Sequence, residues 1–340
     1  MRLRLLLLFL PVLLGACSKT ATPVQVDFVG ATTLTSSNKV VNPNDTLTTR
    51  TYAVGNDNAL THLRVTVTYN RGLTPIVYPV PIVGYDVTTG PDAQTITYLD
   101  SALVLAPGPN GPRGGDILYQ NQFSARATSG TELWQYTATD NAKQSATRAY
   151  QLTVRKPDSA ALFHSYTTIL QPPGNAATTP HAVLDRARVY LNLRYGLLLP
   201  RYSVINRENT LVNNQQLVDL ICTARSAGIA LEAPADPAYQ SAQTSNRWPT
   251  RRTTKLLQTT LTPVDFSAVA LTSDLNTAFA NGQPFQPTTA PYSTSTGPLT
   301  ANQVVAFKTT EGYTGLILVV SILPGTVPVL TCMVKVAKSL

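Results

Sequence analysis

Charged residues are scarce in this chain: Asp, Glu, Lys and Arg make up only 13% of its 340 residues. The formal net charge is +8, and the basic residues behind it are spread along the sequence. A protein that binds nucleic acid gathers its Lys and Arg into a stripe or patch. We therefore expect no nucleic-acid partner.

Residues typical of catalytic and metal sites are also few. The three histidines, His62, His164 and His181, form no zinc-ligand spacing such as H-E-x-x-H, and no G-x-S-x-G elbow is present. The glycine-rich segment 108–115 lacks the Lys-Ser/Thr pair of a phosphate-binding loop. The 18 acidic residues leave one catalytic site possible, a pair of glycosidase carboxylates, because such a pair is recognised by its distance in space and not by its spacing in the sequence. We expect no enzymatic activity, no cofactor and no metal site.

Long apolar runs are missing as well. After residue 16 no apolar run reaches 18 residues without a charge or a turn signal, so we expect no membrane-spanning helix. Residues 1–16 have the three parts of an export signal: Arg2 and Arg4, ten apolar residues at 5–14, and small residues before the cut. The apolar segment is too short to span a bilayer. The signal predicts export, and its removal lowers the formal charge to +6.

The residue that follows the signal is a cysteine. Leu14-Gly15-Ala16-Cys17 resembles the lipobox of bacterial lipoproteins. The resemblance implies a diacylglyceryl group on Cys17 and acylation of its amine, and two or three chains together anchor a protein firmly. Ser18 follows this cysteine, where the inner-membrane retention signal has Asp. Without that signal, the resemblance implies a lipid anchor in the outer membrane, on its periplasmic or its cell-surface face. An ordinary signal peptide with a chance cysteine is the alternative.

The mature chain is long enough for two domains. Its 25 prolines and 19 glycines, with abundant Thr and Val, predict a mainly β protein. We expect a lipidated tether at 17–23, a β-sandwich at 24–155 and an α+β domain at 156–340. Pro157 lies in the polar segment between the domains and resists strand continuation. Each part is large enough to fold separately.

Alternating apolar residues indicate the strands of the sandwich. We predict one strand at 62–70 and another at 97–105, the second with Leu99, Leu103 and Leu105 on one face. A hairpin follows, whose inward residues are Trp134, Tyr136, Ala138, Tyr150, Leu152 and Val154. With its Thr-Ala-x-Asp continuation and the turn at Asp140-Asn141, this hairpin resembles the last one of immunoglobulin-like bacterial surface domains. The resemblance implies an immunoglobulin-like fold and no particular ligand.

The second domain mixes helices and strands. We predict a helix within 182–194 that becomes extended before Gly196. Segment 213–227 has a helical stripe, although 218–221 is also compatible with a strand. Thr262 and Pro263 predict a helix start, because Thr is a good cap and Pro suits the first turn. A second short helix is expected at 274–280. A three-stranded antiparallel meander at 303–308, 313–323 and 327–336 should end the chain, with its middle strand buried on both faces.

Several motifs of this region resemble a recurrent C-terminal domain of Bacteroidetes lipoproteins. They are the stretches at 218–220, 252–256, 262–266, 304–317 and 334–336. The resemblance implies location and architecture only, because we know of no activity assigned to that domain. It also favours structural roles for Thr254 and Lys255.

One stretch combines basic and aromatic residues. Trp248, Arg251 and Arg252 are candidate ligand contacts, with Trp248 stacking on a sugar. The alternative, which we favour, is a Trp248 that packs inward and arginines that are solvated.

Cys222 and Cys332 are the other cysteines. An oxidising compartment permits a disulfide between them. Cys332 shares a strand face with Leu330 and Val334, so two buried free thiols are the alternative that we favour.

Two functions fit this sequence. The first is a membrane-anchored surface module with a structural or interaction role, its partner a surface protein or other ligand that the sequence does not identify. The second is a carbohydrate-binding lipoprotein of a nutrient-uptake system, its partner a glycan.

Overall fold

A computed structural model describes residues 22–71, 94–105, 111–154, 161–172, 180, 183–184, 187–205, 212–237, 248–285, 290–338 and 340. The export signal at 1–16, the lipidation site Cys17 and the domain junction at 156–159 lie outside the described residues. Strands dominate the described chain, which confirms the mainly β fold class.

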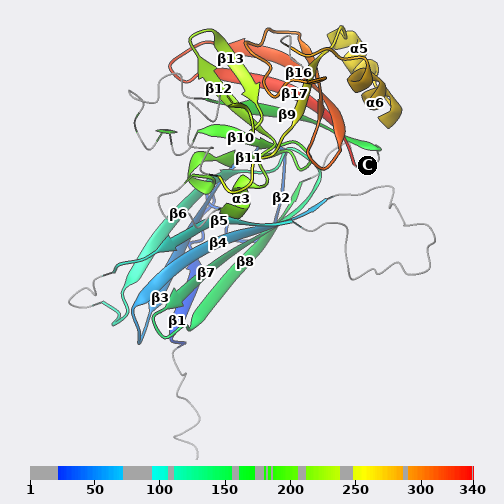
Figure 1. Ribbon diagram of the computed structural model, residues 1–340. Helices are drawn as coiled ribbons and strands as arrows, with labels where there is room; N and C mark the ends of the chain where they lie inside the picture. The colour runs from blue at the N-terminus through cyan, green and yellow to red at the C-terminus, as the bar shows by residue number, and fades with distance from the viewer. Residues whose placement is uncertain are drawn as a thin grey trace, which may run out of the picture.

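The first half is a sandwich of two sheets (Figure 1). One sheet has the order β1-β3-β6, with β1 (Val24–Phe28), β3 (Thr46–Gly55) and β6 (Asp116–Ser124). The other has the order β2-β8-β7-β4-β5, with β2 (Lys39–Val41), β8 (Ser145–Val154), β7 (Gly130–Asp140), β4 (Leu60–Arg71) and β5 (Gln94–Ala102). Neighbours pair antiparallel, except that β2 and β8 run parallel. The immunoglobulin-like strand order stays a prediction.

The predicted hairpin is present with the expected face inward. Trp134, Tyr136 and Ala138 of β7 are fully buried, and Tyr150 and Leu152 of β8 are almost so. The strand predicted at 97–105 lies at 94–102, and Leu99, Leu103 and Leu105 are partly buried and pack against the core as expected. The buried residues Ile96 and Tyr98 were not predicted, because Tyr98 is an extra residue in the pairing with β4 and this bulge shifts the alternation.

The second half contains two further sheets. One has the order β11-β10-β12-β13, with β11 (Leu197–Pro200), β10 (Arg188–Asn192), β12 (Leu220–Arg225) and β13 (Gly228–Glu232). The other has the order β14-β15-β16-β17-β9, with β14 (Lys255–Gln258), β15 (Val304–Lys308), β16 (Thr314–Leu323), β17 (Val329–Ala337) and β9 (Phe163–Leu170). The predicted meander is the β15-β16-β17 part of this sheet, and β16 is buried on both faces along Gly315–Val319.

The sheets stack as layers. Leu191, Leu220 and Cys222 of the four-stranded sheet pack against Val305, Ile317, Val334 and other residues of the five-stranded sheet. The opposite face of the five-stranded sheet carries α5 (Pro263–Ala268) and α6 (Thr272–Ala280), which bury Phe266 and Leu275 there. Figure 1 shows both helices on the outside of this sheet.

The helix start predicted at Thr262-Pro263 is confirmed, and the second helix, predicted at 274–280, begins two residues earlier, at Thr272. Thr262 caps α5: its Oγ1 accepts the amide N–H of Asp265, whose carboxylate accepts the N–H of Thr262 in return. The C-terminal carbonyls of α5 accept hydrogen bonds from a buried lysine of β17: Lys335 Nζ donates to Phe266 O at 2.8 Å and to Val269 O at 2.9 Å. Lys335 belongs to the closing motif of the Bacteroidetes resemblance, and its role here is to hold a helix on the sheet.

The helix predicted within 182–194 was wrong over its second half. The described chain forms β10 there, and the helical stripe at 213–227 shrinks to α3 (Val212–Gln215) before β12 begins. The four-stranded sheet is buried on both faces, so Val189, Tyr190 and Leu191 are all buried. A strand with two buried faces has no period-two alternation, and for that reason the pattern resembled a helix.

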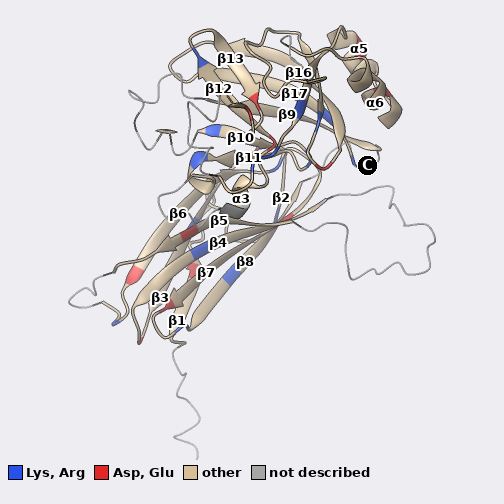
Figure 2. Cartoon of the chain, viewed as in Figure 1, with Lys and Arg blue, Asp and Glu red and all other residues tan. Residues whose placement is uncertain are grey.

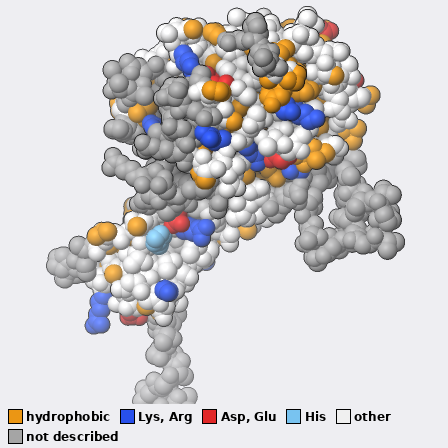
Figure 3. Space-filling view, in the orientation of Figure 1, with side chains coloured by type: hydrophobic (Ala, Val, Ile, Leu, Met, Phe, Trp, Pro, Cys, Tyr) orange, Lys and Arg blue, Asp and Glu red, His pale blue; other side chains and the backbone are white. Residues whose placement is uncertain are grey.

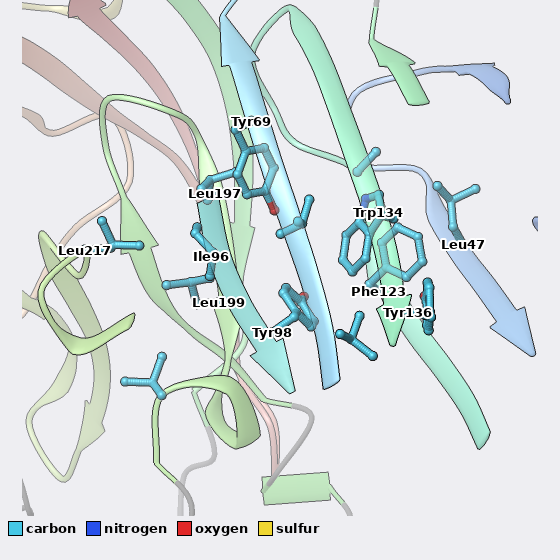
Figure 4. Close-up of a cluster of buried hydrophobic side chains, with 14 of the residues drawn as sticks. Leu47, Tyr69, Ile96, Tyr98, Phe123, Trp134, Tyr136, Leu197, Leu199 and Leu217 are labelled. Carbon is cyan, nitrogen blue, oxygen red and sulfur yellow. The ribbon is translucent and has the colours of Figure 1, made fainter. Parts of the chain in front are cut away.

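A single hydrophobic cluster joins the two halves. It contains Val65, Tyr98, Trp134 and other sandwich residues together with Tyr190, Leu197, Leu199, Leu217, Ile221 and Trp248 of the second half. Figure 4 shows Leu197 and Leu199 beside Ile96 of β5. The four-stranded sheet therefore closes one end of the sandwich core.

Candidate functional site

The three residues proposed from the sequence as ligand contacts have different surroundings. Trp248 is only 4% exposed, and its ring packs 5.9 Å from that of Tyr190. A buried indole offers no free face for stacking on a sugar, so Trp248 has the inward-packed geometry. Arg251 is exposed.

Arg252 is a structural residue in the described chain. Its Nη1 lies 2.7 Å from Asp219 Oδ1 and also contacts Glu311, and its Nε donates to the carbonyl of Gln216. Asp219 is fully buried and accepts the backbone N–H of Leu193 at 2.8 Å. Arg252 and Asp219 belong to two motifs of the Bacteroidetes resemblance, and here they connect β12 to the segment before β14.

Thr254 completes this connection. It is fully buried, and its hydroxyl donates to the carbonyl of Asp219 at 2.8 Å. The contact agrees with the structural role expected for Thr254, whereas Lys255 lies with its ammonium 4.7 Å from the ring centre of Tyr292.

Burial of Asp219 predicts a pH-dependent stability. Desolvation raises the pKa of Asp219 to about 6, although Arg252 lowers it. Between roughly pH 4 and pH 6 the folded protein therefore holds a proton that the unfolded chain has lost, so this residue's contribution to the free energy of unfolding falls as pH rises through that window. We expect Asp219→Asn to remove this dependence. The free energy of unfolding of the wild type, relative to that of Asp219→Asn, should therefore be greater at pH 4 than at pH 7 by roughly 2–3 kcal/mol. Urea unfolding at both pH values measures it, and an equal difference at both would contradict it.

The two cysteines of the mature core are free thiols in the structure. Cys222 and Cys332 are no more than 2% exposed and lie in one hydrophobic cluster between the two sheets of the second half. Burial raises the pKa of the Cys332 thiol to about 12 and that of Cys222 well above its ordinary value. Both cysteines thus have the surroundings of core residues.

Charged side chains are scattered over the surface. Figures 2 and 3 show blue and red positions interspersed, with no continuous patch of one sign on the face in view. No group of three or more His, Cys, Asp or Glu within the described ranges is arranged to hold a metal ion. Nor does any helix in that part of the chain have the length and apolar character needed to cross a membrane.

A pocket lies where the sandwich meets the second half. It has a volume of about 200 Å³, and its lining comes from the ends of β3 and β6, the middle of β5, and β10, β11 and the chain next to them. The lining residues are Thr46, Tyr98, Gln122, Phe123, Ser124, Gln171, Arg188, Leu198, Pro200 and Tyr202. Junctions between domains are a common position for ligand sites, and this one is below the roughly 300–1,000 Å³ of drug-sized sites. It has room for one small ligand group.

Aromatic rings support the base of this pocket. Phe123 is 4% exposed and lies 3.9 Å from the ring centre of Trp134, and Tyr98 lies 4.9 Å from the same ring. Tyr202, in η2 (Arg201–Ser203), packs edge-on to Tyr98 at 5.8 Å and donates from its hydroxyl to Asn121 at 3.3 Å. Burial raises the pKa values of Tyr98 and Tyr202, so both phenols are neutral at physiological pH. Each ring of the base packs on another.

Arg188 is the charged residue of the pocket lining. It begins β10, and its Nη2 donates to Thr46 Oγ1 at 3.3 Å. Among the residues that the structure describes, no carboxylate forms an ion pair with it. The amides of Gln122 and Gln171 and the hydroxyl of Ser124 also line the cavity. The pocket therefore combines one cation, several neutral polar groups and an aromatic base.

Sequence reasoning missed this site. Arg188 lies in the segment for which we predicted a helix, and Tyr98 was not among the core residues predicted for its strand. The pocket forms only because β11 and η2 pack on β5 and on the end of β6. No motif in the sequence marks that packing, which brings together residues up to 156 positions apart.

Comparisons with known proteins add little to this picture. No family model matches the chain, and no curated protein matches it significantly. A DUF4466 family protein from Parabacteroides merdae, a member of the Bacteroidetes, is similar at 11% identity over 94% of this chain and 100% of that one, with a TM-score of 0.34. The Pseudomonas fluorescens alkylpurine DNA glycosylase AlkC, bound to DNA containing an abasic site analog, is similar at 11% identity over 43% of this chain and 33% of that one, with a TM-score of 0.23. Both scores are below 0.5, so neither likeness supports a conclusion about function.

Proposed function

We propose that this protein is a Bacteroidetes-type lipoprotein, anchored in the outer membrane through lipid on Cys17, whose sandwich is a spacer for the second half. The protein acts as a structural or interaction module with no enzymatic activity. One observation supports this proposal most strongly: the first strand of the sandwich begins at the end opposite the pocket.

The start of the folded chain and the pocket lie at opposite ends of the sandwich. Val24 of β1 pairs with Gly55, the last residue of β3, whereas Thr46, the first residue of β3, lines the pocket. Ten residues of strand separate the two ends by roughly 30 Å. Figure 1 shows β1 and the lower sandwich extending away from the sheets of the second half. A lipid on Cys17 would hold the near end at the membrane and leave the pocket facing away from it.

Lipid attachment is the first test. We expect wild-type protein expressed in its host to incorporate a fatty-acid analogue and to sediment with outer membranes. Cys17→Ser should lose the label and give unprocessed or soluble protein, because the acyl chains are the membrane attachment in this proposal. A labelled Cys17→Ser protein would contradict it.

Carbohydrate binding is a second candidate function, and the pocket favours it. Sugar sites combine an aromatic surface with amides and hydroxyls that exchange hydrogen bonds with ring hydroxyls. Tyr202, Gln122 and Gln171 offer these groups in one cavity. The proposed sugar site is therefore this pocket rather than the surface around Trp248.

Tyr202 tests this second function. It is partly exposed, so Tyr202→Ala removes a wall of the pocket while the buried Tyr98 and Phe123 remain. We expect wild-type protein to bind members of a glycan array and Tyr202→Ala to lose that binding. Unchanged binding by Tyr202→Ala would place the sugar elsewhere.

A further inference from the structure

We propose that the pocket selects sugars that carry a carboxylate, and that Arg188 binds this group. The inference rests on the proposed carbohydrate function and names its ligand class: a uronic acid, either free or at the end of a glycan chain. It depends on the charges that line the cavity.

The guanidinium of Arg188 keeps donors available. It has five N–H groups, and Nη2 makes its one described hydrogen bond, to Thr46 Oγ1. No carboxylate among the described residues pairs with it, so within that part of the chain the positive charge in this cavity is not neutralised. A planar carboxylate matches the fork of a guanidinium and can accept two parallel N–H bonds from it.

The neutral part of the lining favours a singly charged ligand rich in hydroxyl groups over other small anions. An amino acid would bring an ammonium group into the cavity, but none of the described lining residues is an Asp or Glu that could receive it. Phosphate and sulfate carry more charge and are usually bound by several cations or by a helix N-terminus. Here a single arginine is accompanied by two glutamines, Gln122 and Gln171, and by the hydroxyls of Thr46 and Ser124. This set suits one negative charge surrounded by hydroxyl groups.

The experiment compares three ligands that differ at a single position. Glucuronic acid, its neutral amide glucuronamide, and glucose are titrated into residues 18–340, and binding is measured by saturation-transfer and chemical-shift NMR. We expect glucuronic acid to bind at least tenfold more tightly than glucuronamide, since hydrogen bonds to a charged group are stronger than those between neutral groups. The preference should decrease as salt is raised from 50 to 500 mM.

Arg188→Gln is the diagnostic variant. It keeps a hydrogen-bonding side chain and removes the charge, so glucuronic acid should lose at least tenfold in affinity while glucuronamide binding changes little. The matched control is Arg64→Gln: Arg64 Nη2 also donates to a threonine hydroxyl, that of Thr97, but Arg64 does not line the pocket. Arg64→Gln should bind all three ligands as the wild type does. Thermal unfolding of each variant checks that the fold is retained.

The outcomes separate this inference from the proposed function. Equal binding of the acid and the amide, each lost in Tyr202→Ala, would overturn the acidic preference and leave carbohydrate binding intact. An acid preference that survives in Arg188→Gln would overturn the role of Arg188. Absence of binding by all three ligands, together with a blank glycan array that includes uronate-terminated glycans, would overturn both proposals.

Discussion

A single thermal transition is expected for Trp134 and Trp248, one tryptophan from each half of the chain. Both belong to the hydrophobic cluster in which the four-stranded sheet closes the end of the sandwich. Residues that share one core lose their packing together. Fluorine NMR of protein labelled with 5-fluorotryptophan measures this directly, because the two tryptophans of the chain give separate signals.

Two leucine variants test the same cluster. Leu199 of β11 is fully buried in it, whereas Leu118 of β6 is 58% exposed. We expect Leu199→Ala to reduce the free energy of unfolding by about 2–5 kcal/mol and to lower the midpoints of both tryptophans equally. Leu118→Ala should change stability by less than about 0.5 kcal/mol.

The sequence predicted the opposite behaviour, with two halves that fold separately. If Trp248 loses its signal while Trp134 stays folded, or if Leu199→Ala shifts Trp248 alone, the halves are independent and the earlier expectation holds. Coincident midpoints with a parallel shift in Leu199→Ala support one cooperative unit.

Arg126→Ala is expected to destabilise the protein by about 3–5 kcal/mol, because it removes the cation from a buried network. Arg126 is 1% exposed, and its Nη1 donates to Asn70 O at 3.0 Å. Fully buried Glu132 accepts the backbone N–H of Arg126 at 2.6 Å and the indole N–H of Trp134 at 2.8 Å. Desolvation raises the pKa of Glu132, and the charge of Arg126 lowers it. Without that charge the buried carboxylate keeps its two hydrogen bonds but has lost its neighbouring cation.

The network also links the halves. The guanidinium of Arg126 contacts Thr128 Oγ1, whose hydroxyl donates to Tyr195 O at 2.7 Å. Next to Tyr195, Gly196 has φ +62°, and an added Cβ there would come within 2.9 Å of the side chain of Thr128. This position therefore requires glycine for its backbone angle and for space.

Arg148→Ala is the matched control for Arg126→Ala. Arg148 lies 3.1 Å from Asp27, but the two side chains are 60% and 39% exposed. A pair on the surface contributes at most about 1 kcal/mol. Urea unfolding of both variants measures the contrast, and similar losses in the two would contradict a special role for the buried arginine.

Local signals in the sequence predicted local structure well. Alternation predicted β4, β7 and β8, and the Thr262-Pro263 cap predicted α5, because these patterns depend on neighbours in the chain. The bulge at Tyr98 and the strand at 188–192 were not predictable in this way. The first depends on how β5 pairs with β4, and the second on a sheet covered on both faces.

The candidate site could not be predicted from the sequence, because it too depends on contacts between distant segments. Arg188, Tyr202 and Gln122 come from three separate segments, and only the docking of β11 and η2 on the sandwich brings them together. Trp248 has basic residues close to it in the sequence, but its ring packs in the core beside Tyr190. Composition near a residue does not decide which way its side chain points.

The distance of the pocket from the membrane tests the central claim, that an anchored sandwich holds a binding pocket away from the lipid. Fluorophores on Asp57→Cys, at the β1 end, and on Gln122→Cys, at the pocket, are compared in lipidated protein on vesicles with nitroxide head groups. Both positions are exposed, and the native Cys222 and Cys332 are buried and so are not labelled. We predict strong quenching at position 57 and little at position 122, which pairs with Thr48 and so lies roughly 23 Å along β3 from Gly55. Equal quenching at the two positions, or stronger quenching at position 122, would contradict the account.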